Sequence, residues 1–172
     1  MRPFPRRTYR SLGQAWADVK DVVQRRALLR STMRGGLSPQ FRERLMLAVT
    51  AVNECRYCAY FHLKVADAIG LSASEARSLL DRRFDDCPTE ELTALLYAQH
   101  WAASDAQPDS TMRARLIEAY GSEQADRIEL TLRLIRIGNL LGNTFDAILY
   151  AVSAGRLGQP QPKGVVHHGD CT

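Results

Sequence analysis

The sequence predicts an all-α fold, a single helical bundle over residues 1–155 followed by an irregular tail over 156–172. Apolar residues recur at helical spacing along most of the chain, and no segment alternates convincingly with period two. Residues typical of helix starts also precede several apolar stretches. A chain of 172 residues, 45% of them hydrophobic, can bury a core without disulfides or a structural metal. Its cysteines are therefore available for chemistry.

The first expected helix begins at the cap Ser11 and ends near Arg30. Its apolar residues recur at helical spacing: Trp16, Val19, Val22 or Val23, and Ala27. Two glycines within residues 33–37 then break the chain. Ser38 followed by Pro39 predicts a second helix over residues 39–52, because serine is a favoured cap and proline suits the first helical position.

Capping signals mark the remaining helices. The third is expected from Cys55 to Ile69, ended by Gly70, and the fourth begins at a capping box of Ser72 and Glu75 and ends at Leu80. The last three are expected over residues 88–103, 110–120 and 122–154. Gly121 separates the final two, and the last one is expected to break at Gly138 or Gly142.

The net charge of +4 is concentrated at the N-terminus, where Arg2, Arg6, Arg7 and Arg10 equal the excess. Such an arm is typical of a solvated tail or a subunit contact, so we expect no nucleic-acid partner. The longest apolar stretch, residues 45–52, is far below the roughly 20 residues of a membrane span. No apolar core follows the basic start, which predicts no signal peptide and a cytoplasmic location.

Cys55 and Cys58 form a C-x2-C pair at the start of the third expected helix, and His62 lies four residues further on. At about 100° per residue, these side chains share one face with Ala66 and Ile69. We therefore expect the pair to be turned toward the core, either buried or at the bottom of a channel. A narrow opening lined by aromatic side chains is expected to give access to it.

The spacing of these residues predicts a redox-active dithiol. A helix N-terminus and a nearby imidazole favour the reactive thiolate, whereas burial alone disfavours it. Residues four apart on a helix are neighbours, so Cys58 and His62 can make an S–H to N contact, and cysteines one turn apart can form a disulfide. The helix N-terminus favours Cys55 as the nucleophile, and the contact with His62 favours Cys58.

Glu43 is the expected carboxylate partner of His62. If the chain reverses near Asn53, the second and third helices run antiparallel, and Glu43 and His62 face each other across an interhelical gap of about 8–10 Å. A carboxylate there can orient the imidazole and accept its proton. Glu54, four residues before Cys58, is an alternative for the same role.

Glu43, Cys55, Cys58 and His62 occur at these offsets within PQFRERLMLAVTAVNECRYCAYFHLKVADAIG. This segment resembles the core of the AhpD-like alkylhydroperoxidase branch of the carboxymuconolactone decarboxylase family. The resemblance covers residues 38–80, and GNTFDAI over residues 142–148 supports it. Tyr57 stands where the best-known members place another histidine, so a relay through that second imidazole is not expected.

The resemblance implies an all-helical fold assembled as a homo-oligomer, a trimer or hexamer, in which the dithiol reduces a hydroperoxide or a small disulfide. It makes Cys58 the sulfur paired with His62, makes Cys55 its disulfide partner and places Glu43 in the proton relay. It also implies a lipoylated or thioredoxin-like protein as the dithiol reductant. We expect no cofactor, no metal and no membrane partner.

Four other interpretations remain open at this point. The fold can serve as a non-catalytic redox switch or ligand-binding module, or it can carry decarboxylase or lactone chemistry, which does not rely on a cysteine pair. The two cysteines can also be inert, or they can bind zinc together with His62 and either Cys87 or His100. Covalent haem attachment is excluded because Ala59 follows the second cysteine.

Several other polar residues are given no role in the chemistry. Cys87 reads as a helix-start residue and His100 as a packing residue, and His167, His168 and Cys171 belong to the tail. A further group shares one face of the last helix and is assigned no function: Asn139, Asn143 and Asp146.

Overall fold

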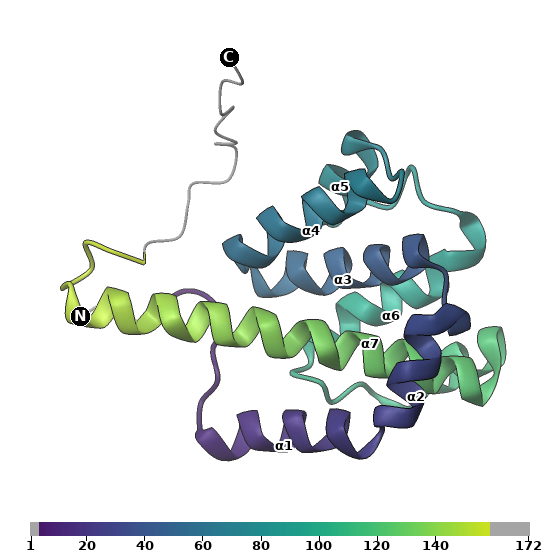
Figure 1. Ribbon diagram of the computed structural model, residues 1–172, viewed down its shortest axis with the longest axis horizontal. Helices are drawn as coiled ribbons and strands as arrows, with labels where there is room; N and C mark the ends of the chain where they lie inside the picture. Colours follow the sequence, from purple (N-terminus) through teal and green to yellow (C-terminus); the bar gives the residue numbers. More distant parts are fainter. Residues whose placement is uncertain (1–3, 159–172) are drawn as a thin grey trace.

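The computed structural model describes residues 4–158, which form α-helices and no strand (Figure 1). The α-helices are α1 (Leu12–Gln24), α2 (Arg26–Ser31), α3 (Pro39–Asn53), α4 (Arg56–Ala68), α5 (Ala73–Leu80), α6 (Leu92–Ala103) and α7 (Ser110–Val152). A π-helical turn, Thr32–Gly36, follows α2, and a 3-10 turn, Thr89–Glu91, precedes α6. The all-α prediction is confirmed for this part of the chain, and most of the expected tail lies outside the described residues.

Serine caps start three of the helices where the sequence predicts them. The hydroxyl oxygens of Ser11, Ser38 and Ser72 each accept a hydrogen bond from a backbone N–H three residues later, at 3.0–3.2 Å. The first expected helix is divided, however, because Arg25 leaves the helical conformation between α1 and α2. Gly35, with φ of +121°, makes the predicted break before α3.

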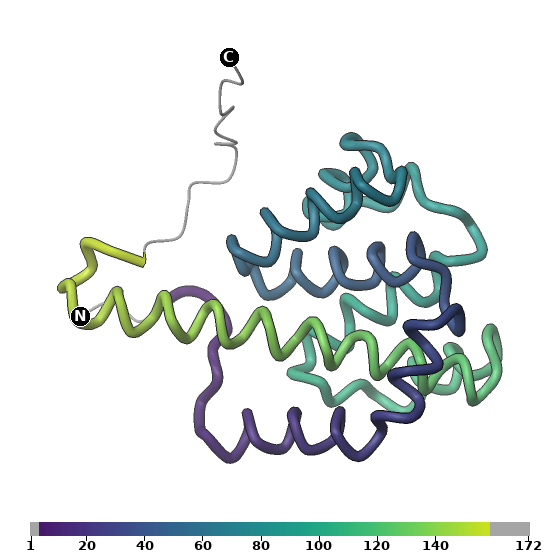
Figure 2. The backbone as a smooth tube through the Cα atoms, viewed as in Figure 1, coloured from purple at the N-terminus to yellow at the C-terminus, as the bar shows by residue number. Residues whose placement is uncertain are grey.

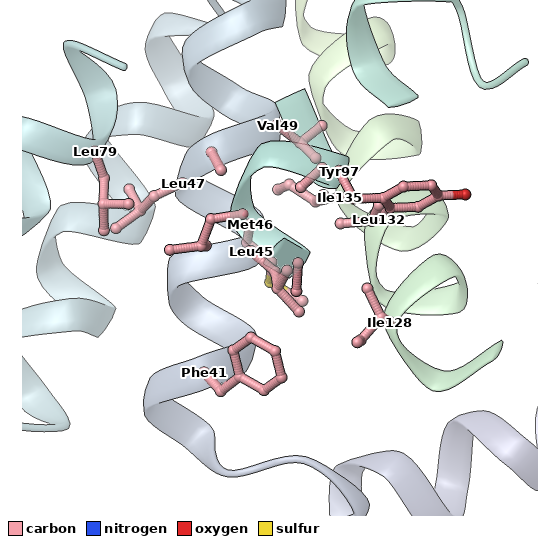
Figure 3. Packing of buried hydrophobic residues seen from close by; sticks show 14 of the residues in the cluster. Phe41, Leu45, Met46, Leu47, Val49, Leu79, Tyr97, Ile128, Leu132 and Ile135 are labelled. Atoms are coloured by element: carbon pink, nitrogen blue, oxygen red, sulfur yellow. The ribbon is translucent and has the colours of Figure 1, made fainter. Parts of the chain in front are cut away.

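Helix α3 lies at the centre of the molecule and contacts α4, α5, α6 and α7. Ten of its fifteen residues are buried, which explains why the apolar run over residues 45–52 also resembles a buried strand. Figure 3 shows its apolar side chains reaching Leu79 of α5, Tyr97 of α6 and Leu132 of α7. The central position of α3 fixes every other helix relative to Glu43, which this helix carries.

Helix α7 joins the two helices expected over residues 110–120 and 122–154. Gly121, with φ of +77° and ψ of +162°, leaves the helical conformation between them, so the chain kinks at the predicted residue. The expected break at Gly138 or Gly142 is wrong, because both residues lie within regular helix. The long C-terminal part of α7 therefore presents one continuous face to α3 and α4.

The basic N-terminal arm is packed, which corrects the expectation of a solvated tail. The Arg6 side chain is only 2% exposed and pairs with Asp146 of α7. Arg7 donates hydrogen bonds to the carbonyl oxygens of Ala102 and Ala103 at the end of α6. Figure 2 shows the arm, in purple, passing against the C-terminal part of α7 before α1 begins. Polar contacts therefore tie the start of the described chain to the bundle.

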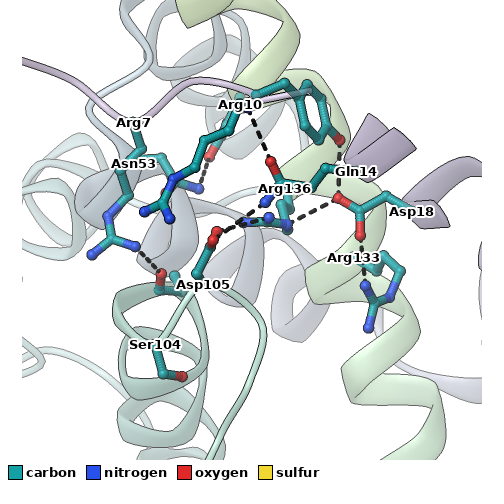
Figure 4. Close-up of polar contacts among 12 residues, drawn as sticks. Arg7, Arg10, Gln14, Asp18, Asn53, Ser104, Asp105, Arg133 and Arg136 are labelled. Atoms are coloured by element: carbon teal, nitrogen blue, oxygen red, sulfur yellow. Dashed lines mark hydrogen bonds and ion pairs between the residues drawn. The ribbon is translucent and has the colours of Figure 1, made fainter. Parts of the chain in front are cut away.

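The apolar residues of α1 face solvent, although their spacing predicts a helix correctly. Trp16 is 67% exposed and Val23 54%, whereas Asp18 on the opposite face is buried. Asp18 accepts hydrogen bonds from Arg133 and Arg136 of α7 (Figure 4). Ion pairs rather than apolar contacts therefore direct this helix toward the bundle. In the described part of the chain, no helix is both long and apolar enough to cross a bilayer.

Candidate redox site between α3, α4 and α7

The reversal between α3 and α4 builds the site. Helix α3 ends at Asn53, Glu54 takes a left-handed conformation with φ of +56°, and Cys55 is the N-cap of α4. The two helices then pack against each other, so residues far apart in the sequence meet. Glu43 and His62, nineteen positions apart, lie side by side for this reason.

His62 and Glu43 form a close pair in the interior. The His62 Nδ1 atom lies 2.6 Å from Glu43 Oε1, and the two residues are 8% and 4% exposed. An ionised Glu43 accepts the Nδ1–H hydrogen bond and leaves Nε2 as the free ring nitrogen. The alternative carboxylate, Glu54, lies at the end of α3 with its side chain 3.8 Å from Arg82, so the structure gives His62 the Glu43 partner.

Cys55 and Cys58 lie in the first turn of α4, and both are free thiols. Cys55 is completely buried, and its Sγ atom accepts a hydrogen bond from the backbone N–H of Cys58 at 3.3 Å. A hydrogen bond from the Cys58 thiol lowers the pKa of Cys55 to about 7 against the opposing effect of burial. Backbone N–H groups of the helix start and the charge of Arg6 act in the same direction.

The pKa of Cys58 is raised, because its proton is held in the hydrogen bond to Cys55 and because the residue is partly buried. A hydrogen bond from Asn139 opposes this shift. When the pair has lost one proton, the negative charge therefore lies on Cys55 and the remaining proton on Cys58. This electrostatic preference agrees with the helix-terminus argument for Cys55, and the choice of Cys58 as the nucleophile stays a prediction.

A pocket of about 360 Å³ opens beside the second cysteine. Cys58 and His62 form its reactive wall, and Cys55 lies outside its lining. The remaining walls are mostly apolar: Met46, Tyr57, Phe61, Leu134, Ile135 and Gly138. Tyr57 is 41% exposed and Phe61 60%, so aromatic side chains stand at the solvent side of the pocket. A small molecule in this pocket meets Cys58 before it can meet Cys55.

Two glycines of α7 make room for the two sulfur atoms. A β-carbon at Gly142 would lie 2.9 Å from Cys55 Sγ, closer than such atoms approach without a shift of one of them. A β-carbon at Gly138 would lie 4.0 Å from Cys58 Sγ, an ordinary contact. These residues therefore act as close-packing positions opposite the dithiol, one helical turn apart, and not as helix breaks.

Asn139 and Asn143, which the sequence left without a role, are completely buried beneath the site. Asn139 accepts a hydrogen bond from the Asn53 side chain at 3.1 Å and donates one to Thr50 at 3.2 Å. Asn143 donates to the carbonyl oxygen of Asn53 at 2.7 Å. Together they hold the end of α3 against α7, directly before the turn that leads to Cys55.

Asp146, also completely buried, holds the first turn of α4. Its carboxylate accepts hydrogen bonds from Arg56 at 2.7 Å, from Tyr57 at 2.8 Å and from Arg6 at 2.8 Å. Burial opposes ionisation, yet these hydrogen bonds hold the pKa of Asp146 below its usual value. The sequence signal for Asp146 was its position on the same helix face as Asn139 and Asn143. Its partners come from segments whose positions the sequence does not reveal.

The other candidate ligands lie apart from the dithiol. His100 pairs with Asp109 at 3.1 Å, and Cys87 is surrounded by the charges of Arg44, Glu75 and Glu91. Burial is the main cause of a raised pKa of Cys87, to about 11. Across residues 4–158, no three His, Cys, Asp or Glu side chains converge in a way that could hold a metal ion. His167, His168 and Cys171 lie outside the described residues.

Comparison with known proteins gives one match. Residues 20–100 match the model of the carboxymuconolactone decarboxylase family. The matched range includes Glu43, Cys55, Cys58 and His62, and it ends before α7. No curated protein and no solved structure gives a significant match.

Proposed function

Residues 20–100 match the model of the carboxymuconolactone decarboxylase family, and on this premise we propose that the chain is a thiol-dependent hydroperoxide reductase. The observation that carries the proposal is that the two cysteines differ in their access to the pocket. Cys58 and His62 line the pocket, while Cys55 lies buried behind them. Decarboxylase or lactone chemistry within the same family does not rely on a cysteine pair.

The reaction begins with the proton shared by the two sulfur atoms. In the singly deprotonated pair this proton lies on Cys58, and Cys55 carries the negative charge. Transfer of this proton from Cys58 to Cys55 leaves a thiolate in the pocket, where it meets the substrate. The hydrogen bond from Asn139 stabilises the Cys58 thiolate formed in this way.

The Cys58 thiolate attacks the terminal oxygen of a hydroperoxide, ROOH. An S–O bond forms, the O–O bond breaks, and Cys58 becomes a sulfenic acid while RO⁻ departs. His62, oriented by the hydrogen bond between its Nδ1 and Glu43, delivers a proton that converts RO⁻ to ROH. The imidazole then recovers this proton from solvent.

Cys55 completes the cycle by attacking the sulfur of the Cys58 sulfenic acid. A disulfide forms, and the departing hydroxide takes the Cys55 proton and leaves as water. An external dithiol, which we propose to be a lipoylated or thioredoxin-like protein, then reduces the disulfide by thiol–disulfide exchange. The apolar side chains of Met46, Leu134 and Ile135 suit the alkyl group of an organic hydroperoxide.

Stopped-flow mixing of the reduced protein with an alkyl hydroperoxide tests the proposal. The wild type should consume the hydroperoxide and form the Cys55–Cys58 disulfide, and Cys58→Ser should slow consumption by at least about a hundredfold. Cys87→Ser, which removes a thiol with a raised pKa away from the pocket, should react like the wild type. Equally slow consumption by wild type and Cys58→Ser would show that this function is wrong.

A further inference from the structure

The N-terminal arm brings a charged side chain to the base of the dithiol. Arg6 lies beside the last residue before Cys55, with one guanidinium nitrogen 3.5 Å from the carbonyl oxygen of Glu54. The other nitrogen donates to Asp146 at 2.8 Å and to the carbonyl oxygen of Gly158 at 3.0 Å. The Arg6 side chain is 2% exposed, so its charge acts in an environment from which water is largely excluded.

The charges around Cys55 do not cancel. Asp146 carries one negative charge, and both Arg6 and Arg56 pair with it, which leaves the cluster one positive charge in excess. The Arg6 and Asp146 side chains are 2% and 0% exposed, whereas that of Arg56 is 33% exposed, so water screens part of this excess charge. Tyr57, the remaining partner of Asp146, donates a hydrogen bond from its hydroxyl and adds no positive charge. The cluster is therefore net positive next to the first turn of α4, where it favours a negatively charged group.

The other acidic groups near this turn already have partners. The Glu54 carboxylate lies 3.8 Å from Arg82, and Glu43 is bound to His62. The α7 residues that face Cys55 and Cys58 most closely are uncharged: Gly138, Asn139 and Gly142. The Cys55 thiol is the acid that remains.

We propose that Arg6 is a positioning residue whose charge, held in place by Asp146, balances the Cys55 thiolate and sets the reactivity and reduction potential of the dithiol. The proposal rests on the redox function proposed above and extends the site to a segment outside residues 20–100. The charge of Arg6 contributes to the lowered pKa of Cys55, after the larger contributions of the Cys58 thiol and the helix start.

The same charge affects the reductive half of the cycle. An external dithiol transfers two electrons to the disulfide, and the products are the Cys55 thiolate, the Cys58 thiol, the external disulfide and one proton. A group that stabilises the thiolate favours the reduced form and raises the reduction potential. Arg6 therefore makes the disulfide easier for its reductant to reset.

Thiolate titration by ultraviolet absorbance, on a chain whose other cysteines are replaced by Cys87→Ser and Cys171→Ser, tests this inference. Arg6→Gln should raise the pKa of Cys55 by about one unit, which means about tenfold less thiolate well below the pKa. At a pH well above both pKa values, the equilibrium with glutathione should shift about tenfold toward the protein disulfide, or about 30 mV for this two-electron couple. Arg6→Lys, which keeps the charge, should restore most of both values.

Two further variants separate charge from structure. Arg7→Gln loosens the same arm, because Arg7 binds the carbonyl oxygens of Ala102 and Ala103, but it leaves the charge cluster intact and should not change the pKa. Asp146→Asn raises the excess from one to two positive charges and should lower the pKa of Cys55, opposite to Arg6→Gln. Circular dichroism checks that each variant remains helical, and if Asp146→Asn does not fold, the Arg6 and Arg7 variants decide.

An unchanged pKa in Arg6→Gln, no restoration by Arg6→Lys, or an equal effect of Arg7→Gln would overturn the inference. A raised pKa in folded Asp146→Asn would do the same. None of these measurements contains a hydroperoxide, so they report on the charge balance even if the protein proves inactive as a peroxidase. Slow hydroperoxide consumption with the expected pKa shifts would overturn the proposed function alone.

Discussion

At the level of single residues, Glu43 determines which nitrogen of His62 faces the pocket. The 2.6 Å contact engages Nδ1, so Nε2 is left for the proposed proton transfer to the departing oxygen. Glu43 is 4% exposed, so its carboxylate is largely shielded from solvent. The orientation of the His62 ring therefore depends on one buried carboxylate of α3.

Glu43→Gln should lower the rate of hydroperoxide reduction by about ten- to hundredfold, because the amide no longer supplies the negative charge that supports a protonated imidazole. The measurement is the stopped-flow rate of disulfide formation over a range of pH. Glu54→Gln is the matched control, since Glu54 lies at the end of α3 near Arg82, and its rate should equal that of the wild type. A larger loss of rate in Glu54→Gln than in Glu43→Gln would show that Glu54, and not Glu43, is the carboxylate of the proton relay.

Local spacing alone predicts that Cys55, Cys58 and His62 share one face, because Cys58 and His62 belong to α4 and Cys55 is its N-cap. The Glu43 contact requires one further step, the antiparallel reversal near Asn53, and that reversal can be inferred from helix lengths. The partners of Asp146 cannot be inferred in this way. They come from the arm and from α4, and their meeting depends on how three separate segments pack.

At the level of elements, α7 approaches α4 closely because glycine occupies the contact positions. Gly142 faces the sulfur of Cys55, and Gly138 faces that of Cys58, one turn earlier. In sequence, these glycines resemble helix breaks, since glycine is unfavourable in a helix interior. The helix continues through them because tertiary packing outweighs this intrinsic preference.

Gly142→Ala should displace Cys55 and slow hydroperoxide-driven disulfide formation by about tenfold or more, since the added β-carbon would lie 2.9 Å from Sγ. Gly138→Ala places its β-carbon 4.0 Å from Cys58 Sγ and should leave the rate nearly unchanged. It should also raise the free energy of unfolding, by up to about 1 kcal/mol, through better helix propensity. Equal rates in the two variants would show that the close approach of α7 to Cys55 does not matter.

Helix starts are the elements that the sequence predicts best. The helix caps are formed by serine side chains that accept hydrogen bonds from the residue three positions later: Ser11, Ser38 and Ser72. The local sequence therefore determines where these helices begin. The orientation of α1 follows a different rule. Its apolar spacing suggests a core-facing side, but the buried pairing of Asp18 with Arg133 and Arg136 turns that side outward.

At the level of the whole molecule, α3 links the core to the chemistry. One part of its surface packs against α5, α6 and α7, and another carries Glu43 toward α4. Its high apolar content made both a bundle and a central position predictable. The packing of the N-terminal arm was not predictable, because arginine-rich ends are usually solvated, and here buried acceptors on α6 and α7 hold Arg6 and Arg7.

The assembled molecule thus separates an accessible sulfur from a buried one, and the location of the first oxidised sulfur follows from this. Cys55→Ser is mixed with one equivalent of alkyl hydroperoxide in the presence of a sulfenic-acid trap such as dimedone, and the labelled peptide is mapped by mass spectrometry. We expect the label on Cys58, with one hydroperoxide consumed per chain. An unlabelled Cys58 with the hydroperoxide left intact would contradict the proposed attack from the pocket.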